Sequence, residues 1–292
     1  MPIIHPYISD LRTALQPYRS QQRIALVPTM GNLHDGHLEL VKIAKQHADI
    51  VVVSIFVNPT QFGVGEDFDS YPRTLDDDAK KLATVGTDYI FAPHVDEMYA
   101  VLPPSTSIRA GAITVQLCGQ SRPDHFDGVG IVVSKLFNIV QPDVAIFGQK
   151  DYQQLAIIKQ LVRDLSYSID IIAAPIVRAV DGLALSSRNQ YLSPAERQVA
   201  PILHQELQYL AQQLADGAHT QQGLAALIVE SSTRISNAGF NIDYLEVKTL
   251  QLEALNNKTS KSPLDVQDLI ILVAAWLGRA RLLDNQLINV NQ

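Results

Sequence analysis

Two histidines, His34 and His37, stand three residues apart and directly follow a segment that contains Gly31. Apolar residues 24–27 before them predict a buried strand, and the apolar periodicity after them predicts a helix over residues 38–48. The pair is therefore expected at a strand-to-helix turn, where free backbone N–H groups and the helix dipole favour a phosphate. Imidazoles at such a turn can donate hydrogen bonds to phosphate oxygens and stabilise charge that develops on them.

The same pair is also compatible with a helix cap or a surface pair that binds nothing. Zinc would need further ligands, and no Cys or His nearby in the sequence supplies them. Cys118 is the single cysteine, so an internal disulfide is excluded, and we expect it as a small buried side chain.

Two further segments carry groups suited to oxyanions. Residues 181–189 place the hydroxyl of Ser186 beside Arg188, which combines a hydroxyl donor with a planar, permanently charged guanidinium. Residues 147–151 follow a predicted strand, open a predicted helix and contain Lys150, which offers a point charge. Taken alone, either segment is equally compatible with an ordinary turn.

Other polar groups are less specific. Asn58 and Gln61 follow a predicted strand, and the carboxamide of Gln61 can bind a hydroxyl or a carboxylate, although a solvent-facing turn is equally compatible. Acidic residues 76–78 could approach magnesium, but three acids in the first turn of a helix favour dipole partners. Residues 122–126 are compatible with a surface loop or a substrate wall. Trp276 lies in an apolar run and is predicted to be buried in the core.

The elements that must position these groups alternate in the first half of the chain. Strands are predicted at residues 24–27, 50–57, 89–92, 144–147 and 169–173, and helices at 38–48, after Thr74, at 130–140 and at 152–165. This alternation predicts an α/β fold with a Rossmann-like, doubly wound parallel sheet, which binds ligands beyond the carboxyl ends of its strands.

The second half has a different pattern. A long amphipathic helix is predicted from Ser193 to Leu214 and another over 220–238, followed by strands at 242–247, 269–275 and 280–284, with a loop at 256–263. We therefore expect two domains: residues 1–175, and a smaller α+β domain of residues 176–292.

Composition excludes several classes of protein. Of the 292 residues, 47% are hydrophobic and 18% are charged, which argues against disorder, and the net charge of −7 disfavours a nucleic-acid-binding face. The N-terminal residues do not have the pattern of a signal peptide, and the longest apolar run, residues 269–277, is too short for a membrane span. We expect a cytoplasmic protein that binds neither nucleic acid nor membranes.

These segments, in this order and spacing, resemble the pantothenate synthetases (pantoate–β-alanine ligases), and the resemblance covers almost the whole chain. Residues 34–37 correspond to the family's form of the HIGH signature of nucleotidyltransferases, and residues 185–188 to its counterpart of the KMSKS loop. Other adenylyl-transferring enzymes share these signatures, whereas the strings at 56–62 and 184–189 separate this family from them much better.

The resemblance implies a two-step reaction. The carboxylate of pantoate attacks the α-phosphorus of ATP to give pantoyl adenylate and pyrophosphate, and the amine of β-alanine then displaces AMP. Magnesium would accompany the ATP phosphates, and the resemblance assigns it no ligand among the protein side chains. It also implies a homodimer formed through the N-terminal domain, and we expect the smaller domain to close over ATP.

The resemblance further implies roles for individual residues. Catalysis is expected of His34, His37, Lys150 and Arg188, with His37 as the proton donor. ATP is expected to contact Met30, Gly31, Asn32, Leu33, His34, Asp35, Gly36, His37, Gly148, Gln149, Lys150, Asp151, Val177, Leu185, Ser186, Ser187 and Arg188. Pantoate is expected at Gln61 and Gln154, and β-alanine at Gln61.

Three positions depart from the family pattern: Gln149 and a position near Cys118, where Glu is usual, and Asp124, where Gly is frequent. Two other function classes stay open: a nucleotidyltransferase that keeps AMP on its product, and a nucleotide-binding module without turnover. Release of both AMP and pyrophosphate marks the ligase, whereas pyrophosphate alone marks the first alternative. The complete set of charged and hydroxyl donors argues against the second. The negative net charge and the lack of a basic anticodon-reading module disfavour a tRNA-charging enzyme.

Overall fold

The computed structural model describes residues 1–63, 65–66, 68–216, 220–255 and 269–288. The chain divides into two compact units, which we describe separately. The first comprises residues 1–149 and 153–176, and the second comprises residues 150–152 and 177–292. The predicted loop at 256–263 lies outside the described residues.

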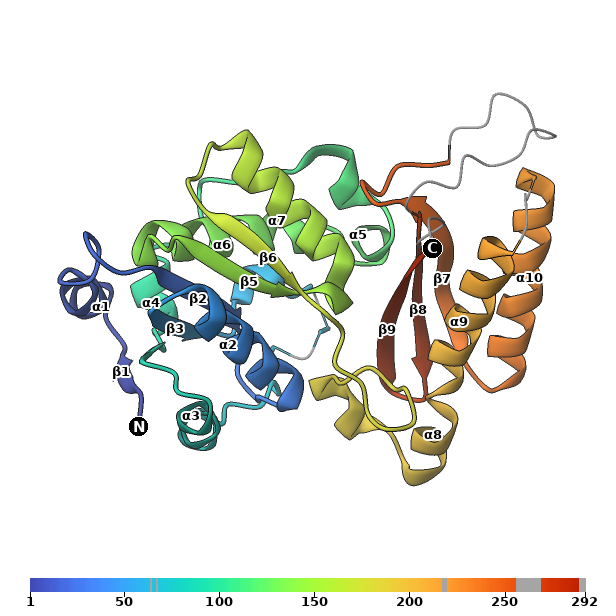
Figure 1. The fold of residues 1–292 in the computed structure, drawn as a ribbon, viewed down its shortest axis with the longest axis horizontal. Coiled ribbons are helices and arrows are strands. Elements are labelled where there is room, and N and C mark those ends of the chain that lie inside the picture. The colour runs from blue at the N-terminus through green and yellow to red at the C-terminus, as the bar shows by residue number, and fades with distance from the viewer. Residues whose placement is uncertain (64, 67, 217–219, 256–268, 289–292) are drawn as a thin grey trace. The chain divides into compact units, whose positions relative to one another are not determined.

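The first unit is built on a six-stranded sheet in the order β1-β4-β3-β2-β5-β6, and all its strand pairs are parallel (Figure 1). The strands are β1 (Ile3–His5), β2 (Ile24–Thr29), β3 (Ile50–Ile55), β4 (Tyr89–Phe91), β5 (Val144–Gly148) and β6 (Asp170–Ala174). The helices are α1 (Ile8–Leu15), α2 (Asp35–His47), α3 (Leu75–Thr84), α4 (Val95–Met98), α5 (Cys118–Ser121), α6 (His125–Val140) and α7 (Tyr152–Asp164). Short 3-10 turns are η1 (Pro59–Gln61), η2 (Gly111–Val115) and η3 (Gln149–Asp151). The predicted doubly wound α/β class is confirmed.

Helices cover both faces of this sheet, which is why its central strands are apolar throughout. On the face of α2 and α3, Val27 and Val53 pack with Val41 and Leu82 in one hydrophobic cluster. Helices α6 and α7 lie on the opposite side (Figure 1). The chain runs from β2 outward to β3 and returns to place β5 on the other side of β2. The switch point of the sheet, where such folds bind ligands, therefore lies between β2 and β5.

The sequence prediction missed β1, α1 and the short helices, and it began α6 too late. This helix starts at His125, five residues before the predicted Gly130. Its N-cap, Asp124, has left-handed backbone with φ 62°. That conformation suits glycine best and Asp better than most other side chains, so Asp124 is compatible with it.

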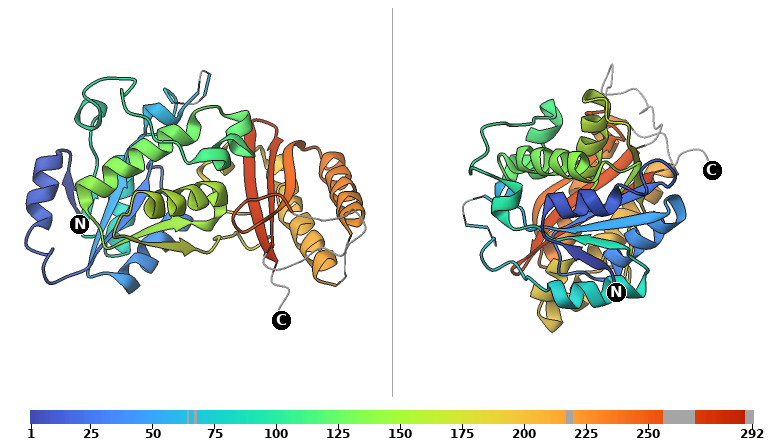
Figure 2. Two further views of the ribbon diagram at one scale, coloured as in Figure 1. Left: turned by 90° about the horizontal axis from the view of Figure 1, so that it is seen from above. Right: turned by 90° about the vertical axis from the view of Figure 1, so that its left-hand side faces the viewer.

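The second unit is an antiparallel three-stranded sheet with helices packed on it. The strands β7 (Asn241–Thr249), β8 (Leu269–Leu277) and β9 (Ala280–Ile288) lie in that order. The other elements are η4 (Ser187–Tyr191), α8 (Pro194–Val199), α9 (Ile202–Ala215) and α10 (Gln221–Asn237). Leucines of α9 pack with the apolar face of β8 in one core, and α10 lies beside α9 (Figure 2).

Two predictions for this unit are wrong. The single helix expected from Ser193 to Leu214 is two helices, because Pro201 lacks the backbone N–H that a continuous helix needs. Trp276, expected in the core, is 43% exposed. It lies near the end of β8 between Asn241 and Arg281 on the flanking strands, so its neighbours in the sheet are polar.

Candidate active site

The turn after β2 carries the histidine pair to the carboxyl edge of the sheet. Gly31 in this turn has φ +82°, a conformation that L side chains rarely adopt. A Cβ on Gly31 would lie 3.0 Å from a methyl group of Ile55 and 3.1 Å from Oδ2 of Asp78. Glycine is therefore required by the backbone conformation and by the close approach of β3 and α3.

Asp78 holds this turn in place from α3. Its two carboxylate oxygens accept hydrogen bonds from the backbone N–H groups of Asn32 (2.9 Å) and Leu33 (2.8 Å), and Oδ2 also accepts from the hydroxyl of Thr74 (3.0 Å). The residue is fully buried. Asp78 was expected to act as a helix-dipole partner, and the structure instead shows an internal acceptor that fixes the turn before α2.

The two imidazoles cap the N-terminus of α2. Nδ1 of His34 accepts from the backbone N–H of Gly36 (3.1 Å), and Nδ1 of His37 accepts from the backbone N–H of His34 (3.3 Å). Because each Nδ1 accepts, these bonds assign the hydrogen of each neutral ring to Nε2. The ring centroids lie 4.2 Å apart. The arrangement supplies two ring N–H donors beside a helix N-terminus, which is the geometry that favours an anion.

A second group of polar residues follows β3, where Asn58 orients the side chain of Gln61. Asn58 is buried, and its Oδ1 accepts from the hydroxyl of Tyr99 (2.8 Å). Its Nδ2 donates to the carbonyl of Gly128 (3.1 Å) and to Oε1 of Gln61 (3.2 Å). Since Oε1 is engaged, Gln61 presents its Nε2 as a donor, and that nitrogen lies 3.1 Å from the sulfur of Met30. A Cβ on Gly128 would lie 2.1 Å from the carbonyl oxygen of Thr60, so α6 and this turn touch through their main chains.

Arg122 and His125 hold the main chain of Gln61. The guanidinium of Arg122 donates to Nε2 of His125 (3.1 Å), so Nδ1 of that ring carries the hydrogen and donates to the carbonyl of Gln61 (2.7 Å). Arg122 donates to the same carbonyl (3.3 Å) and pairs with Glu66 through two hydrogen bonds. Arg122 and His125 thus contact the main chain of Gln61, whereas Pro123 and Asp124 between them are exposed.

We expect the Glu66–Arg122 pair to make the stability of the first unit depend on pH in the acid range. Burial raises the pKa of Glu66, but the hydrogen bonds and charge of Arg122 outweigh it and hold the pKa below its ordinary value. A lowered folded-state pKa stabilises the fold above the unfolded-state pKa, and this contribution is lost as the pH falls through the folded-state pKa. We expect the melting temperature of Glu66→Gln to fall less than that of the parent between about pH 5.5 and about pH 3.

Melting curves by circular dichroism check this expectation, with Glu39→Gln as the matched control. Glu39 forms an exposed ion pair with Lys42, so this variant should follow the parent. Parallel acid profiles for Glu66→Gln and the parent would contradict the expectation.

The other expected site residues of the first unit lie at the carboxyl end of β5 and in the first turn of α7. Gly148 ends β5, Gln149 follows it, and Gln154 is half-buried in the first turn of α7. The neighbouring Gln153 has a structural role, because its carboxamide accepts from the backbone N–H of Cys118 (3.0 Å) and donates to two carbonyls. Cys118 is buried, as predicted.

The remaining expected residues belong to the second unit. Backbone hydrogen bonds between Val177 and Leu185 and between Ala179 and Leu183 form a hairpin of residues 177–185. Ser186 follows it as the N-cap of η4, and its hydroxyl accepts from the backbone N–H of Arg188 (3.3 Å). Ser187 and Arg188 lie in the first turn of η4, and Lys150 and Asp151 belong to the short segment of residues 150–152 that is part of this unit.

Sequence reasoning missed Glu66 and the structural roles of Asp78 and Asn58. A signal for Asp78 was present, because it lies three residues after Leu75 and four before Leu82, on the buried face of α3. Within the described ranges, no group of three or more His, Cys, Asp or Glu could hold a metal ion, and no helix has the length and apolar character to cross a membrane.

Comparisons with known proteins agree with this architecture. The sequence model of the pantoate-beta-alanine ligase family matches residues 3–287. The pantothenate synthetase of Psychrobacter cryohalolentis is 74% identical over 292 residues, which is all of both chains. The crystal structure of pantothenate synthetase from Thermus thermophilus is 38% identical with a TM-score of 0.86, covering 98% of this chain and 99% of that one. The Francisella tularensis pantoate-beta-alanine ligase, complexed with beta-gamma ATP and beta-alanine, is 35% identical with a TM-score of 0.79 and 98% of both chains covered.

The fold and the first-unit site define a doubly wound α/β protein in which a histidine-capped helix N-terminus follows β2, next to the switch point of the sheet. The comparisons identify the family within this class of fold. The chain belongs to the pantoate–β-alanine ligase family, and its activity is that of a ligase.

Proposed function

We propose that the protein condenses pantoate with β-alanine, coupled to cleavage of ATP to AMP and pyrophosphate, through a pantoyl-adenylate intermediate. The observation that carries the proposal is the pair of capping imidazoles. Their Nδ1 atoms are engaged by the backbone, so each ring holds its hydrogen on Nε2 as a donor at the N-terminus of α2, without any need for protonation. Donors preorganised in this way stabilise the charge that builds on phosphate oxygens.

Roles for the other residues follow the chemistry of the two steps. In the first step a pantoate carboxylate oxygen forms a bond to the α-phosphorus, and the bond to the pyrophosphate oxygen breaks. His34, His37, Lys150, Ser186 and Arg188 supply donors for the leaving pyrophosphate. In the second step the neutral amine of β-alanine forms the amide bond and AMP leaves with the carboxylate oxygen. Gln61 would orient pantoate and then β-alanine, and Gln154 would orient pantoate.

ATP contacts are proposed for the turns that follow β2 and β5 and for the hairpin region of the second unit. They comprise residues 30–37, Gly148, Gln149, Lys150, Asp151, Val177 and residues 185–188. Magnesium would enter as part of the substrate MgATP, held by phosphate oxygens. The departure at Gln149 removes a charge but keeps a hydrogen-bonding side chain.

Labelled pantoate provides the decisive experiment. The protein is incubated with ATP, magnesium, β-alanine and pantoate carrying ¹⁸O in its carboxylate, and the products are identified by mass spectrometry. We expect pantothenate, pyrophosphate and AMP that contains one ¹⁸O atom. A stable adenylylated product without AMP would instead indicate a nucleotidyltransferase, and ATP binding without turnover would indicate a nucleotide-binding module.

Gln61 gives a prediction for substrate binding. Because Asn58 engages its Oε1, the remaining donor is Nε2, and Gln61→Glu replaces that donor by an acceptor. We expect the KM for pantoate to rise by about tenfold or more while the KM for ATP changes little, since an unmatched polar contact costs about 1–3 kcal/mol. Initial rates at varied pantoate and ATP measure both constants.

Gln120, an exposed residue of α5, supplies the control. Its replacement, Gln120→Glu, introduces the same charge change away from β3 and should leave both constants unchanged. An unaltered pantoate KM in Gln61→Glu would count against the role proposed for Gln61.

We also propose that the protein is a cytoplasmic homodimer, as the resemblance to the family implies. Light scattering of the purified protein would give the mass of a dimer, and a monomer mass would refute the assembly. Closure of the smaller domain over ATP remains a prediction, which crosslinking the domains without loss of turnover would refute.

A further inference from the structure

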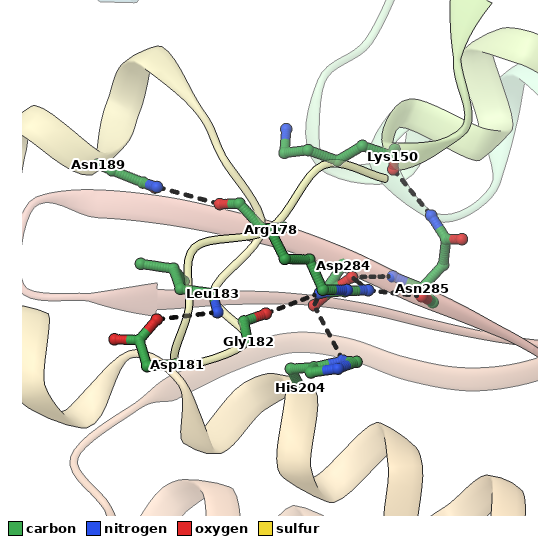
Figure 3. Close-up of polar contacts among 10 residues, drawn as sticks. Lys150, Arg178, Asp181, Gly182, Leu183, Asn189, His204, Asp284 and Asn285 are labelled. Carbon is green, nitrogen blue, oxygen red and sulfur yellow. Dashed lines mark hydrogen bonds and ion pairs between the residues drawn. The ribbon is translucent and has the colours of Figure 1, made fainter. Parts of the chain in front are cut away.

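Two consecutive residues of β9, Asp284 and Asn285, contact two separate segments that carry proposed ATP-binding residues (Figure 3). Both are buried polar side chains, 5% and 2% exposed. Buried polar groups are unfavourable unless they are hydrogen-bonded, so their presence in a strand of an apolar sheet requires an explanation.

Asp284 holds the hairpin that precedes Ser186. Its two carboxylate oxygens accept from the two terminal nitrogens of Arg178, at 2.6 and 2.8 Å, in a two-pronged ion pair. The guanidinium also donates to the carbonyl of Gly182 at the tip of the hairpin (3.1 Å). Asp284 thus fixes Arg178, and Arg178 links the start of the hairpin of residues 177–185 to its tip.

Arg178 is the charged partner of Asp284, because the histidine near this ion pair is expected to be neutral. The backbone N–H of Asn285 donates to the same carboxylate (2.8 Å), and Nδ1 of His204 lies 3.9 Å from it. Burial and the charge of Arg178 lower the pKa of His204, which favours the neutral ring near pH 7.

Asn285 holds the second segment. Its Nδ2 donates to the backbone carbonyl of Lys150 (2.9 Å), while the carbonyl of Asn285 lies 3.5 Å from a nitrogen of Arg178. Close by in the sequence, the hydroxyl of Tyr152 donates to the carbonyl of Leu250 (3.1 Å). The main chain around Lys150 is therefore held at two points within the second unit.

We propose that Asp284 and Asn285 are positioning residues for ATP: Asp284, through Arg178, sets the backbone that presents Ser186 and Arg188, and Asn285 sets the backbone that presents Lys150. The segments that carry Lys150 and Arg188 are distant in the sequence, but both are held by adjacent residues of β9. The inference rests on the proposed function, because it assumes that those cations contact ATP. Shifts of about 1 Å in such groups lower rates by up to about 100-fold.

Asn285→Ala is the primary test, because it removes the contact to Lys150 without leaving a buried charge unpaired. Asp284→Asn is the second variant, although the loss of a partner for Arg178 also destabilises the fold. The control is Asp243→Asn, which removes the ion pair between β7 and Arg281 of the same strand β9. The KM for ATP, the KM for β-alanine, the melting temperature and calorimetric ATP affinity are measured for each full-length variant.

We expect kcat/KM for ATP to fall by about 10-fold to 100-fold in Asn285→Ala and Asp284→Asn, with a matching loss of ATP affinity and an unchanged KM for β-alanine. Asp243→Asn should keep the ATP constants of the parent. A merely structural role would lower the melting temperature and kcat while the KM for ATP stayed constant, and that result would overturn the proposal.

The calorimetric measurement separates this inference from the proposed function. A parent protein that binds ATP but makes no pantothenate refutes the proposed function, and the ATP affinities of the variants still decide the positioning role. Parent-like ATP affinity in Asn285→Ala refutes the role of Asn285. A parent that does not bind ATP overturns both.

Discussion

His37→Ala is expected to lower the rate of pyrophosphate release from ATP and pantoate by about 10²–10³-fold, the range for loss of one preorganised oxyanion donor. Because the Nδ1 of His37 accepts from the backbone of His34, the ring has a fixed orientation and offers Nε2–H. Alanine removes that donor from the turn. Single-turnover measurements of pyrophosphate release, with the enzyme in excess, isolate the first step.

The same substitution also removes half of a capping box, which should reduce stability by only about 1 kcal/mol. His47→Ala supplies the control, since His47 is exposed in the last turn of the same helix. It should keep the parent rate. Equal single-turnover rates for His37→Ala and the parent would show that His37 serves the helix cap alone.

Asp78→Ala is expected to reduce the free energy of unfolding by about 3 kcal/mol, because hydrogen bonds to a charged group contribute about 1.5–3 kcal/mol each and are not additive. The substitution leaves the N–H groups of Asn32 and Leu33 without their acceptor. Asp78→Asn should be almost as damaging, since its NH₂ group would face one of the two backbone donors. Urea titration followed by circular dichroism measures the change.

Asp77→Ala is the matched control, because Asp77 is the exposed neighbour that pairs with Lys80. It should change stability little. Both Asp78 variants should also weaken ATP binding, since the turn of Asn32 and Leu33 would no longer be held. Stability and ATP affinity of Asp78→Ala equal to those of the parent would contradict the role assigned to this carboxylate.

The sequence predicted the sheet well because buried parallel strands and their helices have strong periodic patterns. Strands such as β3 and β5 are short apolar runs, and Ser193 with Glu196 forms the capping box that starts α8. By contrast, β1 is a short edge strand with exposed side chains, so its pattern is weak. The early start of α6 depends on the left-handed backbone of Asp124, which residue type alone does not reveal.

The candidate site was predicted less completely. The sequence motifs contain the candidate catalytic and binding residues, but not the residues that fix their position through hydrogen bonds. The imidazoles and Gln61 stand in recognisable motifs. Asp78 and Arg122 act through contacts to residues 45 and 61 positions away in the sequence, and only the tertiary fold brings such groups together. Trp276 was misplaced because a run that is apolar at every position does not reveal which residues face the core: its neighbours Ala275 and Leu277 pack in the core, whereas Trp276 is exposed.

The meeting of α6 and the turn of residues 58–61 has a consequence for variation in this protein. A carbonyl of that turn lies where any side chain at position 128 would begin. The location of Gln61 is therefore set by two main chains in contact, which every amino acid shares. Even a single methyl group at position 128 would therefore displace the turn that carries Gln61.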